Sequence, residues 1–214
     1  MPSAERIDAL TVDAMGTLVE LVDPTEALGA ALSERGIDAA PDDIAAAFRA
    51  EVAYYVPRAQ EGRDDRTLQD LARRCAGVFL DHLAAPLSAD EFAPAFVGAL
   101  EFRPLDGAVQ ALEQVQAAGL SLACVSNWDA SLGGQLERAG LRRHFAAVVS
   151  SAEAGAPKPD PAVFRLALER LGTEPARTLH VGDEEADREG AAAAGLEFEP
   201  APLATVPERL GLPG

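Results

Sequence analysis

The 214-residue sequence is poor in cysteine and in histidine. Its two cysteines, Cys75 and Cys124, are too few and too distant in sequence for a disulfide framework or a zinc site. Their apolar neighbours predict that both are buried, reduced thiols. The three histidines have no partners at metal-ligand spacing. We therefore predict helix packing for His82, an exposed turn for His144 and a position inside a buried strand for His180.

Long apolar runs and positive charge are also scarce. No stretch approaches the roughly 18 apolar residues that indicate a membrane-spanning helix. Lys and Arg number 18 against 35 Asp and Glu, which gives a formal net charge of −17. Such an acidic surface repels phosphate backbones and anionic lipids, so we expect neither nucleic acid nor a membrane as a partner. Residues 1–6 lack the apolar core of a signal peptide, and we expect a cytoplasmic protein. No feature of the sequence indicates an oligomeric state.

The composition is that of a globular chain with a sizeable core, since 48% of the residues are apolar and 25% are charged. Residues 19–100 are predicted to be almost entirely helical, because apolar residues recur there at three- and four-residue spacing. Ser88-Ala-Asp-Glu91 matches a capping box at the start of the last of these helices. The four expected helices cover residues 24–35, 41–55, 68–82 and 88–100.

From residue 101 onward, short apolar strands alternate with helices. Strands are expected near residues 7–12, 120–127, 145–151 and 178–183, with helices near 106–118, 131–139, 160–172 and 187–194. This alternation predicts a parallel sheet with right-handed crossovers. The expected fold is therefore an α/β core, Rossmann-like, with helices on both faces of a parallel sheet and an all-helical insert after the first strand. We predict that residues 1–18 and 101–214 form the core and that residues 19–100 form the insert.

Polar residues follow four of these segments. Asp13 ends the first strand and precedes Gly16 and Thr17, Ser126 and Asn127 end the second, Lys158 follows the third, and Asp183 and Asp187 follow the last. Because the carboxyl ends of parallel strands meet at one edge of a sheet, these groups are expected to converge. Carboxylates without His or Cys suit a hard cation such as Mg²⁺, and a lysine with a serine hydroxyl suits a phosphoryl group. Asp13 could then act as a carboxylate nucleophile.

In this arrangement the chain resembles the haloacid dehalogenase-like hydrolase superfamily over nearly its whole length. The four motifs appear in order as Asp13-Ala-Met15-Gly16-Thr17-Leu18, Val125-Ser126-Asn127, Lys158-Pro159 and Val181-Gly182-Asp183-Glu-Glu-Ala-Asp187. The helical insert is similar to the family's type-one cap, which closes over the active site and sets specificity.

The resemblance implies a role for each matching residue. Asp13 attacks phosphorus, Ser126 binds a phosphate oxygen, and Lys158 holds both the phosphate and the nucleophile. Gly16, Thr17 and Asn127 belong to the phosphate-binding set, with Asn127 expected to supply a backbone N–H. Mg²⁺ is bound by Asp13, the backbone carbonyl of Met15 and Asp183, and Asp187 completes the outer metal shell. The implied activity is Mg²⁺-dependent hydrolysis of a small phosphorylated metabolite through an aspartyl-phosphate intermediate.

Met15 departs from the family pattern. Family phosphatases carry a second Asp at this position, which protonates the leaving oxygen and then activates water, and a thioether can do neither. Turnover of alkyl phosphates is therefore expected to be weak unless another acid, such as Glu20 or a residue of the insert, takes over this role. Two alternatives remain open: a 2-haloacid dehalogenase, which also lacks the second Asp, and a non-catalytic relative that binds a phosphorylated ligand or a protein. Asp183 and Asp187 favour the metal-dependent phosphatase, because clustered carboxylates repel one another unless a cation joins them.

Overall fold

The computed structural model describes residues 7–212, and the chain divides into two compact units. One unit combines Met1–Glu20 with Phe102–Gly214 and is called the α/β unit here. The other, Leu21–Glu101, is called the helical unit. Each unit has its own hydrophobic core.

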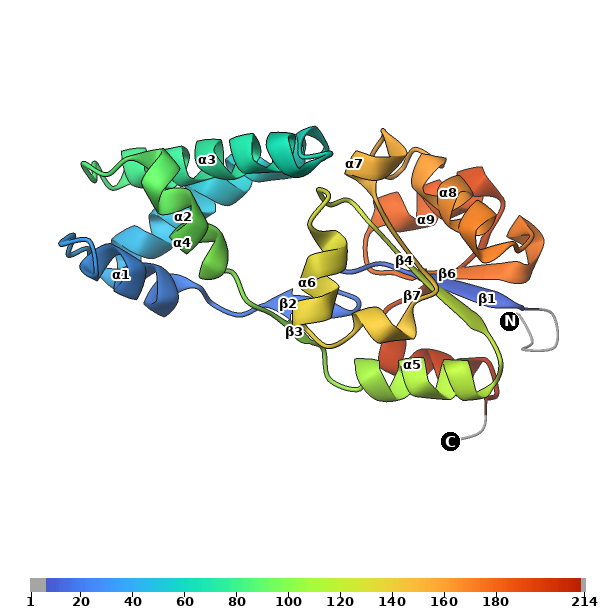
Figure 1. Ribbon diagram of the computed structural model, residues 1–214. Coiled ribbons are helices and arrows are strands. Elements are labelled where there is room, and N and C mark those ends of the chain that lie inside the picture. The colour runs from blue at the N-terminus through green and yellow to red at the C-terminus, as the bar shows by residue number, and fades with distance from the viewer. Residues whose placement is uncertain (1–6, 213–214) are drawn as a thin grey trace. The chain divides into compact units, whose positions relative to one another are not determined.

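The α/β unit is built on a parallel sheet, as the sequence predicts, and this sheet has five strands (Figure 1). Four of the strands are the predicted ones, and the fifth lies at one edge and was not predicted. In spatial order the strands are β5 (Ala147–Ser150), β4 (Ser121–Ser126), β1 (Ala9–Val12), β6 (Thr178–Gly182) and β7 (Glu197–Pro200). β1 is central, so the residue that follows it, Asp13, emerges in the middle of the carboxyl edge.

Alternate residues of each strand face opposite sides of the sheet, and each side is covered by helices. Leu10 and Val12 of β1 belong to a core that includes buried residues of α5, α6 and α10. The other side of the sheet packs against α8 and α9, where Phe164 of α8 is fully buried. Figure 1 shows α8 and α9 on one face and α5 on the other. The bounds of these helices are Ala108–Ala117 (α5), Leu132–Arg138 (α6), Ala162–Leu171 (α8), Glu185–Ala194 (α9) and Val206–Arg209 (α10).

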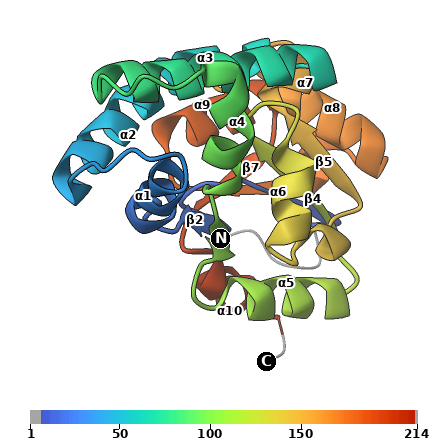
Figure 2. The same ribbon diagram turned by 60° about the vertical axis from the view of Figure 1, so that its left-hand side comes forward.

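The helical unit contains four α-helices and a 3₁₀ segment, and α3 packs beside both α2 and α4 (Figure 2). Phe79 of α3 stacks on Phe92 of α4 with ring centroids 6.0 Å apart, and it meets Phe96 at 5.3 Å. These three rings are almost fully buried and form the centre of the unit. The elements are α1 (Thr25–Ser33), α2 (Pro41–Tyr55), η2 (Val56–Glu61), α3 (Asp65–His82) and α4 (Ala89–Gly98).

The helix ends differ in detail from the expected ones. Ser88 precedes α4, but its side chain makes no capping hydrogen bond, so the predicted capping box is wrong. A capping box opens α3 instead: Asp64 accepts a hydrogen bond from the Thr67 N–H, and the Thr67 hydroxyl accepts one from the Asp64 N–H. Threonine takes the place that Glu or Gln holds in the sequence signature, and the pattern search therefore missed it.

The remaining short elements connect the two units and fill turns. β2 (Val19–Leu21) and β3 (Phe102–Pro104) pair as a two-stranded sheet at the junctions of the helical unit. α7 (Ser151–Ala154) follows β5, and four-residue helices of this kind have too few residues to show a helical period. The short 3₁₀ segments are η3 (Arg142–His144), η4 (Pro175–Arg177) and η5 (Leu203–Thr205).

Several expectations about single residues can be compared with the structure. Cys75 and Cys124 are buried and form no disulfide bond within residues 7–212, as predicted. His144 is buried rather than exposed, because Gln116 lies 2.8 Å from its Nδ1 atom and fixes the ring against α5. Among residues 7–212, no helix is long and apolar enough to cross a membrane.

Glu51 makes the stability of the helical unit depend on pH. It is a buried carboxyl of α2, and burial raises its pKa although a hydrogen bond with Cys75 opposes the shift. An acid whose pKa is higher in the folded state binds more protons when folded, so the free energy of unfolding falls as pH rises through the window between the two pKa values. We predict that Glu51→Gln removes this decrease, as measured by urea unfolding followed by circular dichroism between pH 4 and pH 8.

Glu91→Gln is the matched control, because Glu91 is an exposed acid in the same unit. It should leave the slope of stability against pH as it is in the parent protein. An unchanged slope in Glu51→Gln would contradict the prediction.

Candidate active site

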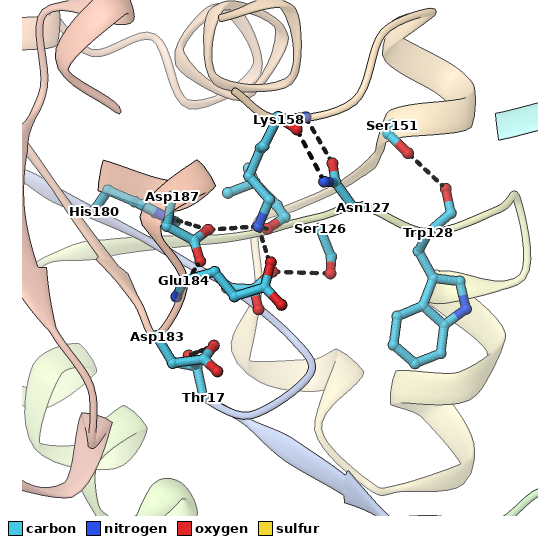
Figure 3. A network of polar contacts seen from close by, with 12 residues as sticks. Thr17, Ser126, Asn127, Trp128, Ser151, Lys158, His180, Asp183, Glu184 and Asp187 are labelled. Atoms are coloured by element: carbon cyan, nitrogen blue, oxygen red, sulfur yellow. Dashed lines mark hydrogen bonds and ion pairs between the residues drawn. The ribbon is translucent and has the colours of Figure 1, made fainter. Parts of the chain in front are cut away.

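The predicted polar residues meet at the carboxyl edge of the sheet. β1 ends at Val12, β4 ends at Ser126 and β6 ends at Gly182, and their parallel pairing places these ends side by side. Figure 3 shows Ser126, Lys158, Asp183 and Asp187 gathered there, all within the α/β unit.

Lys158 forms a fork with two buried carboxylates. Its ammonium Nζ lies 2.5 Å from Asp13 Oδ1 and 2.5 Å from Asp187 Oδ1. Ser126 Oγ donates a second hydrogen bond to Asp13 Oδ1 at 2.9 Å. Both donors therefore reach the same oxygen of Asp13, and its Oδ2 accepts no hydrogen bond from residues 7–212. The free oxygen is the one available to a ligand.

Burial and the neighbouring charges together shift the pKa values of the three residues of the fork. Burial raises the pKa of Asp13, and the ammonium of Lys158 opposes that shift. Burial alone would lower the pKa of Lys158, but the charges of Asp13 and Asp187 raise it above the ordinary value. Burial would raise the pKa of Asp187, yet the hydrogen bond from His180 and the charge of Lys158 lower it to about 2. Lys158 is therefore a cation and Asp187 an anion at neutral pH.

The side chain of Asn127 holds the backbone of Lys158. Its Oδ1 accepts a hydrogen bond from the Lys158 N–H at 2.7 Å, and its Nδ2 donates to the Lys158 carbonyl at 3.1 Å. The side-chain amide of Asn127 thus hydrogen-bonds both backbone polar groups of Lys158 and joins two segments of the chain. The family resemblance implied a backbone role for Asn127 toward phosphate. It did not reveal that the side chain of Asn127 holds the backbone of Lys158.

The turn after Asp13 is shaped around Asp183. Thr17 Oγ1 donates to Asp183 Oδ1 at 3.1 Å, so this hydroxyl is bonded to a carboxylate of the site. Gly16 has a φ of +77°, and a Cβ atom there would lie 2.3 Å from Asp183 Oδ2. Only glycine fits this position, because the backbone is left-handed and no space remains beside the carboxylate.

Asp187 is bonded at both oxygens. Oδ1 is reached by Lys158 Nζ and by His180 Nε2 at 2.9 Å, and Oδ2 accepts the Glu184 N–H at 3.1 Å. A Cβ atom on Gly182 would lie 2.4 Å from Asp187 Cγ, so glycine at the end of β6 lets this carboxylate approach closely. These contacts suit a residue that orients its neighbours.

The three carboxylates also form a candidate cation site. One oxygen each of Asp13, Asp183 and Asp187 lie within 4.8 Å of one another. The set offers only hard oxygen donors, which is the chemistry that Mg²⁺ prefers. With Lys158 as the one cation of the fork, the three acids leave an excess of negative charge that a divalent ion would neutralise. The residues present therefore fit Mg²⁺.

Met15 lies in the turn after Asp13, at the position where the family pattern has a second acid, and Glu20 lies on β2 just beyond that turn. Met15 is 41% exposed, so its thioether is at the surface of the α/β unit rather than in its core. Glu20 lies on β2 and pairs with Arg103, with Nε 2.8 Å from Glu20 Oε1. Its carboxylate is held by this arginine.

The structure brings together the predicted Asp13, Ser126, Lys158, Asp183 and Asp187. It adds two buried residues, Thr11 and His180, that sequence reasoning placed in the strands without a role at the site. No local pattern identifies them, because His180 is seven residues from Asp187 and Thr11 lies on another strand. The one available signal was a polar pair at matching register inside two apolar strands.

Comparison with known proteins identifies the family of this chain. Residues 7–195 match the family model described as haloacid dehalogenase-like hydrolase. The chain belongs to this family, and the fold and motif order described above are those that the sequence predicted.

Similar proteins include phosphatases and dehalogenases. The mouse haloacid dehalogenase-like hydrolase domain-containing protein 3 is 41% identical over 124 residues, which is 58% of this chain and 49% of that protein. Phosphoserine phosphatase of Thermus thermophilus is 39% identical over 115 residues, or 52% of this chain and 46% of that protein. The matches thus span about half the length of these relatives.

Among solved structures, L-2-haloacid dehalogenase of Xanthobacter autotrophicus superposes with a TM-score of 0.63 at 28% identity. The superposition covers 90% of this chain and 76% of that one. This similarity shows a common fold.

Removal of Lys158 tests the fork directly. We predict that Lys158→Met lowers the free energy of unfolding by about 3–5 kcal/mol, because it leaves two buried carboxylates without their cation. The double variant Lys158→Met, Asp187→Asn should be more stable than Lys158→Met alone, since one uncompensated charge is gone. Urea unfolding at pH 7 in the presence of EDTA measures both values.

Asp187→Asn in the parent background completes the double-mutant cycle. Effects of the two substitutions that simply add would mean that Lys158 and Asp187 do not interact, and the fork would then have no energetic role.

Proposed function

We propose that this protein is a Mg²⁺-dependent phosphatase that acts on a small phosphorylated metabolite through an aspartyl-phosphate intermediate. The observation that carries the proposal is the arrangement of Asp13, whose Oδ1 is held by Ser126 and Lys158 while Oδ2 is left free. A carboxylate held in this way presents one oxygen in a fixed direction. The similarity to a phosphoserine phosphatase supports the same class of substrate.

In the first step Asp13 Oδ2 attacks phosphorus. An oxygen–phosphorus bond forms to Asp13, and the bond from phosphorus to the leaving oxygen breaks. Lys158 and Ser126 donate toward the phosphoryl oxygens, where negative charge accumulates. In the second step water attacks the acyl phosphate, which releases phosphate and regenerates the Asp13 carboxylate.

Mg²⁺ would be held by Asp13, Asp183 and the backbone carbonyl of Met15, with Asp187 in the outer shell. When bound, the ion supplies positive charge to the phosphoryl oxygens and to the carboxylate cluster. Thr17 fixes the direction of Asp183.

Substrate selection is assigned to the helical unit, as the family's cap. Its two connections to the α/β unit run through β2 and β3, where Val22 N donates to Glu101 O at 2.9 Å. A unit inserted through two adjacent strands can move as one body. The substrate itself is proposed to be small and phosphorylated, and the compartment is proposed to be the cytoplasm.

The proposal predicts phosphate release from acetyl phosphate and from p-nitrophenyl phosphate. Both leaving groups depart without a proton from the enzyme, so the thioether of Met15 should matter little for them. Release should require Mg²⁺, disappear with EDTA and disappear in Asp13→Asn, which removes the nucleophile while keeping the shape of the side chain. A phosphate-specific colorimetric assay measures all three conditions.

A 2-haloacid dehalogenase is the second candidate, favoured by Met15 and by the similarity to the Xanthobacter enzyme. Chloride release from 2-chloropropionate without Mg²⁺, together with no phosphate release, would replace the phosphatase by this function. Phosphate binding with no turnover of either substrate would instead identify a non-catalytic relative.

Met15→Asp should raise the turnover of alkyl phosphates by roughly 10²–10⁴-fold, the usual contribution of a positioned general acid or base. Turnover of acetyl phosphate should change much less, because its leaving group needs no proton. The ratio of the two kcat values separates proton transfer from any general effect of the substitution. Met15→Asn is the matched control, since it has the same shape and cannot donate a carboxylic proton. No gain in the turnover of alkyl phosphates would contradict the assignment of the missing acid to this position.

A further inference from the structure

Thr11 and His180 lie directly behind Asp187, inside the sheet. They occupy facing positions on the neighbouring strands β1 and β6, and both are fully buried. His180 Nε2 is 2.9 Å from Asp187 Oδ1, and His180 Nδ1 is 3.0 Å from Thr11 Oγ1. The edge of Phe164 packs against the ring with centroids 4.8 Å apart. A continuous line of contacts therefore runs from Thr11 through His180 and Asp187 to Lys158 and Asp13. Figure 3 shows its middle part, from His180 through Asp187 to Lys158.

The partners of the ring determine which nitrogen carries its proton. The ionised carboxylate of Asp187 only accepts hydrogen bonds, so His180 Nε2 must be the donor. With its proton on Nε2, the neutral ring has an acceptor at Nδ1. Thr11 offers Nδ1 two oxygens, each at 3.0 Å: the carbonyl, which cannot donate, and the hydroxyl, which can. The hydroxyl of Thr11 is therefore the group that makes this tautomer compatible with its surroundings.

We propose that Thr11 and His180 are positioning residues that fix Asp187 Oδ1 and, through it, the alignment of Lys158 with the nucleophile Asp13. Oδ1 accepts from both His180 and Lys158, so a change in the first contact alters the geometry of the second. Loss of a partner behind a catalytic carboxylate typically costs about 10- to 100-fold in activity. The kinetic consequence rests on the proposed phosphatase function, whereas the tautomer and its dependence on Thr11 do not.

The first measurement is the tautomer of His180 in the ¹⁵N-labelled protein. Long-range ¹H–¹⁵N correlation spectra distinguish the ring nitrogen that carries the proton from the one that does not, and the parent protein should show the proton on Nε2. Thr11→Val keeps the shape of the side chain and removes the hydroxyl, so Nδ1 then faces only a carbonyl. This variant should shift the ring toward the Nδ1–H form or the doubly protonated form. A proton on Nδ1 in the parent protein, or an unchanged tautomer in Thr11→Val, would overturn the proposal.

The second measurement compares three substitutions of His180 in the p-nitrophenyl phosphate assay. Glutamine places an N–H the same number of bonds from Cα as Nε2, asparagine places one at the position of Nδ1, and leucine has neither. His180→Asn and His180→Leu should lower kcat by about 10- to 100-fold with little change in KM, and His180→Gln should recover most of the loss. Equal losses in the glutamine and leucine variants would mean that His180 only fills space.

His144→Leu is the control for general damage, because His144 is also buried and hydrogen-bonded but lies against Gln116 at η3 and α5. Its kcat should stay within about twofold of the parent value. If the parent protein releases no phosphate from any substrate, the proposed function fails, and the spectra still decide whether Thr11 sets the tautomer of His180.

Discussion

The ammonium of Lys158 is the charge on which the whole carboxyl edge of the sheet depends. A cation this deeply buried is tolerated only if it is paired, and it is paired twice, with Asp13 and with Asp187. The same contact explains why two carboxylates can lie so close together, since each would otherwise raise the other's pKa. Lys158 thus holds Asp13 in position and gives its other partner, Asp187, a charged state that burial alone would oppose.

The rest of the fold can be understood as the support of that contact. Parallel pairing brings the ends of β1, β4 and β6 together, which places Asp13, Ser126 and the turn at Asp183 at one edge. Lys158 comes from a loop rather than from a strand, so it needs a separate constraint, and the amide of Asn127 supplies it through both polar groups of the Lys158 backbone. The helices α8 and α9 cover the face of the sheet behind the site, and α9 begins where Asp187 must lie.

Much of this could be predicted from the sequence, for reasons that are local. Apolar strands that end in a polar residue gave four of the five parallel strands and the convergence of their ends. β7 was missed because Glu197-Phe-Glu-Pro200 lies at an edge and lacks an apolar run. The capping box was placed at Ser88 instead of Asp64 because the pattern records residue types and cannot record whether a side chain turns toward the backbone.

The contacts that the sequence could not reveal are those between groups that no spacing relates. Asn127 and Lys158 are 31 residues apart, and Thr11 and His180 are 169 apart, so each pair is defined only by the register of the folded sheet and its loops. His180 in particular has the features of an ordinary core position, since its ring packs on Phe164 inside an apolar strand. The role proposed for His180 depends on its two hydrogen-bond partners, Thr11 at Nδ1 and Asp187 at Nε2.

The arrangement around Asp183 bears on which chemistry the edge serves. The turn at Gly16 has a left-handed backbone and no room for a Cβ atom, and Thr17 donates a hydrogen bond to the same carboxylate. A third acid beside Asp13 and Asp187 adds electrostatic repulsion unless a cation joins the three carboxylates. In this chain Gly16 leaves room for Asp183, and Thr17 holds its carboxylate near Asp13 and Asp187. A divalent cation bound by the three acids would remove the repulsion between them, and for that reason we propose a metal-dependent reaction at this site.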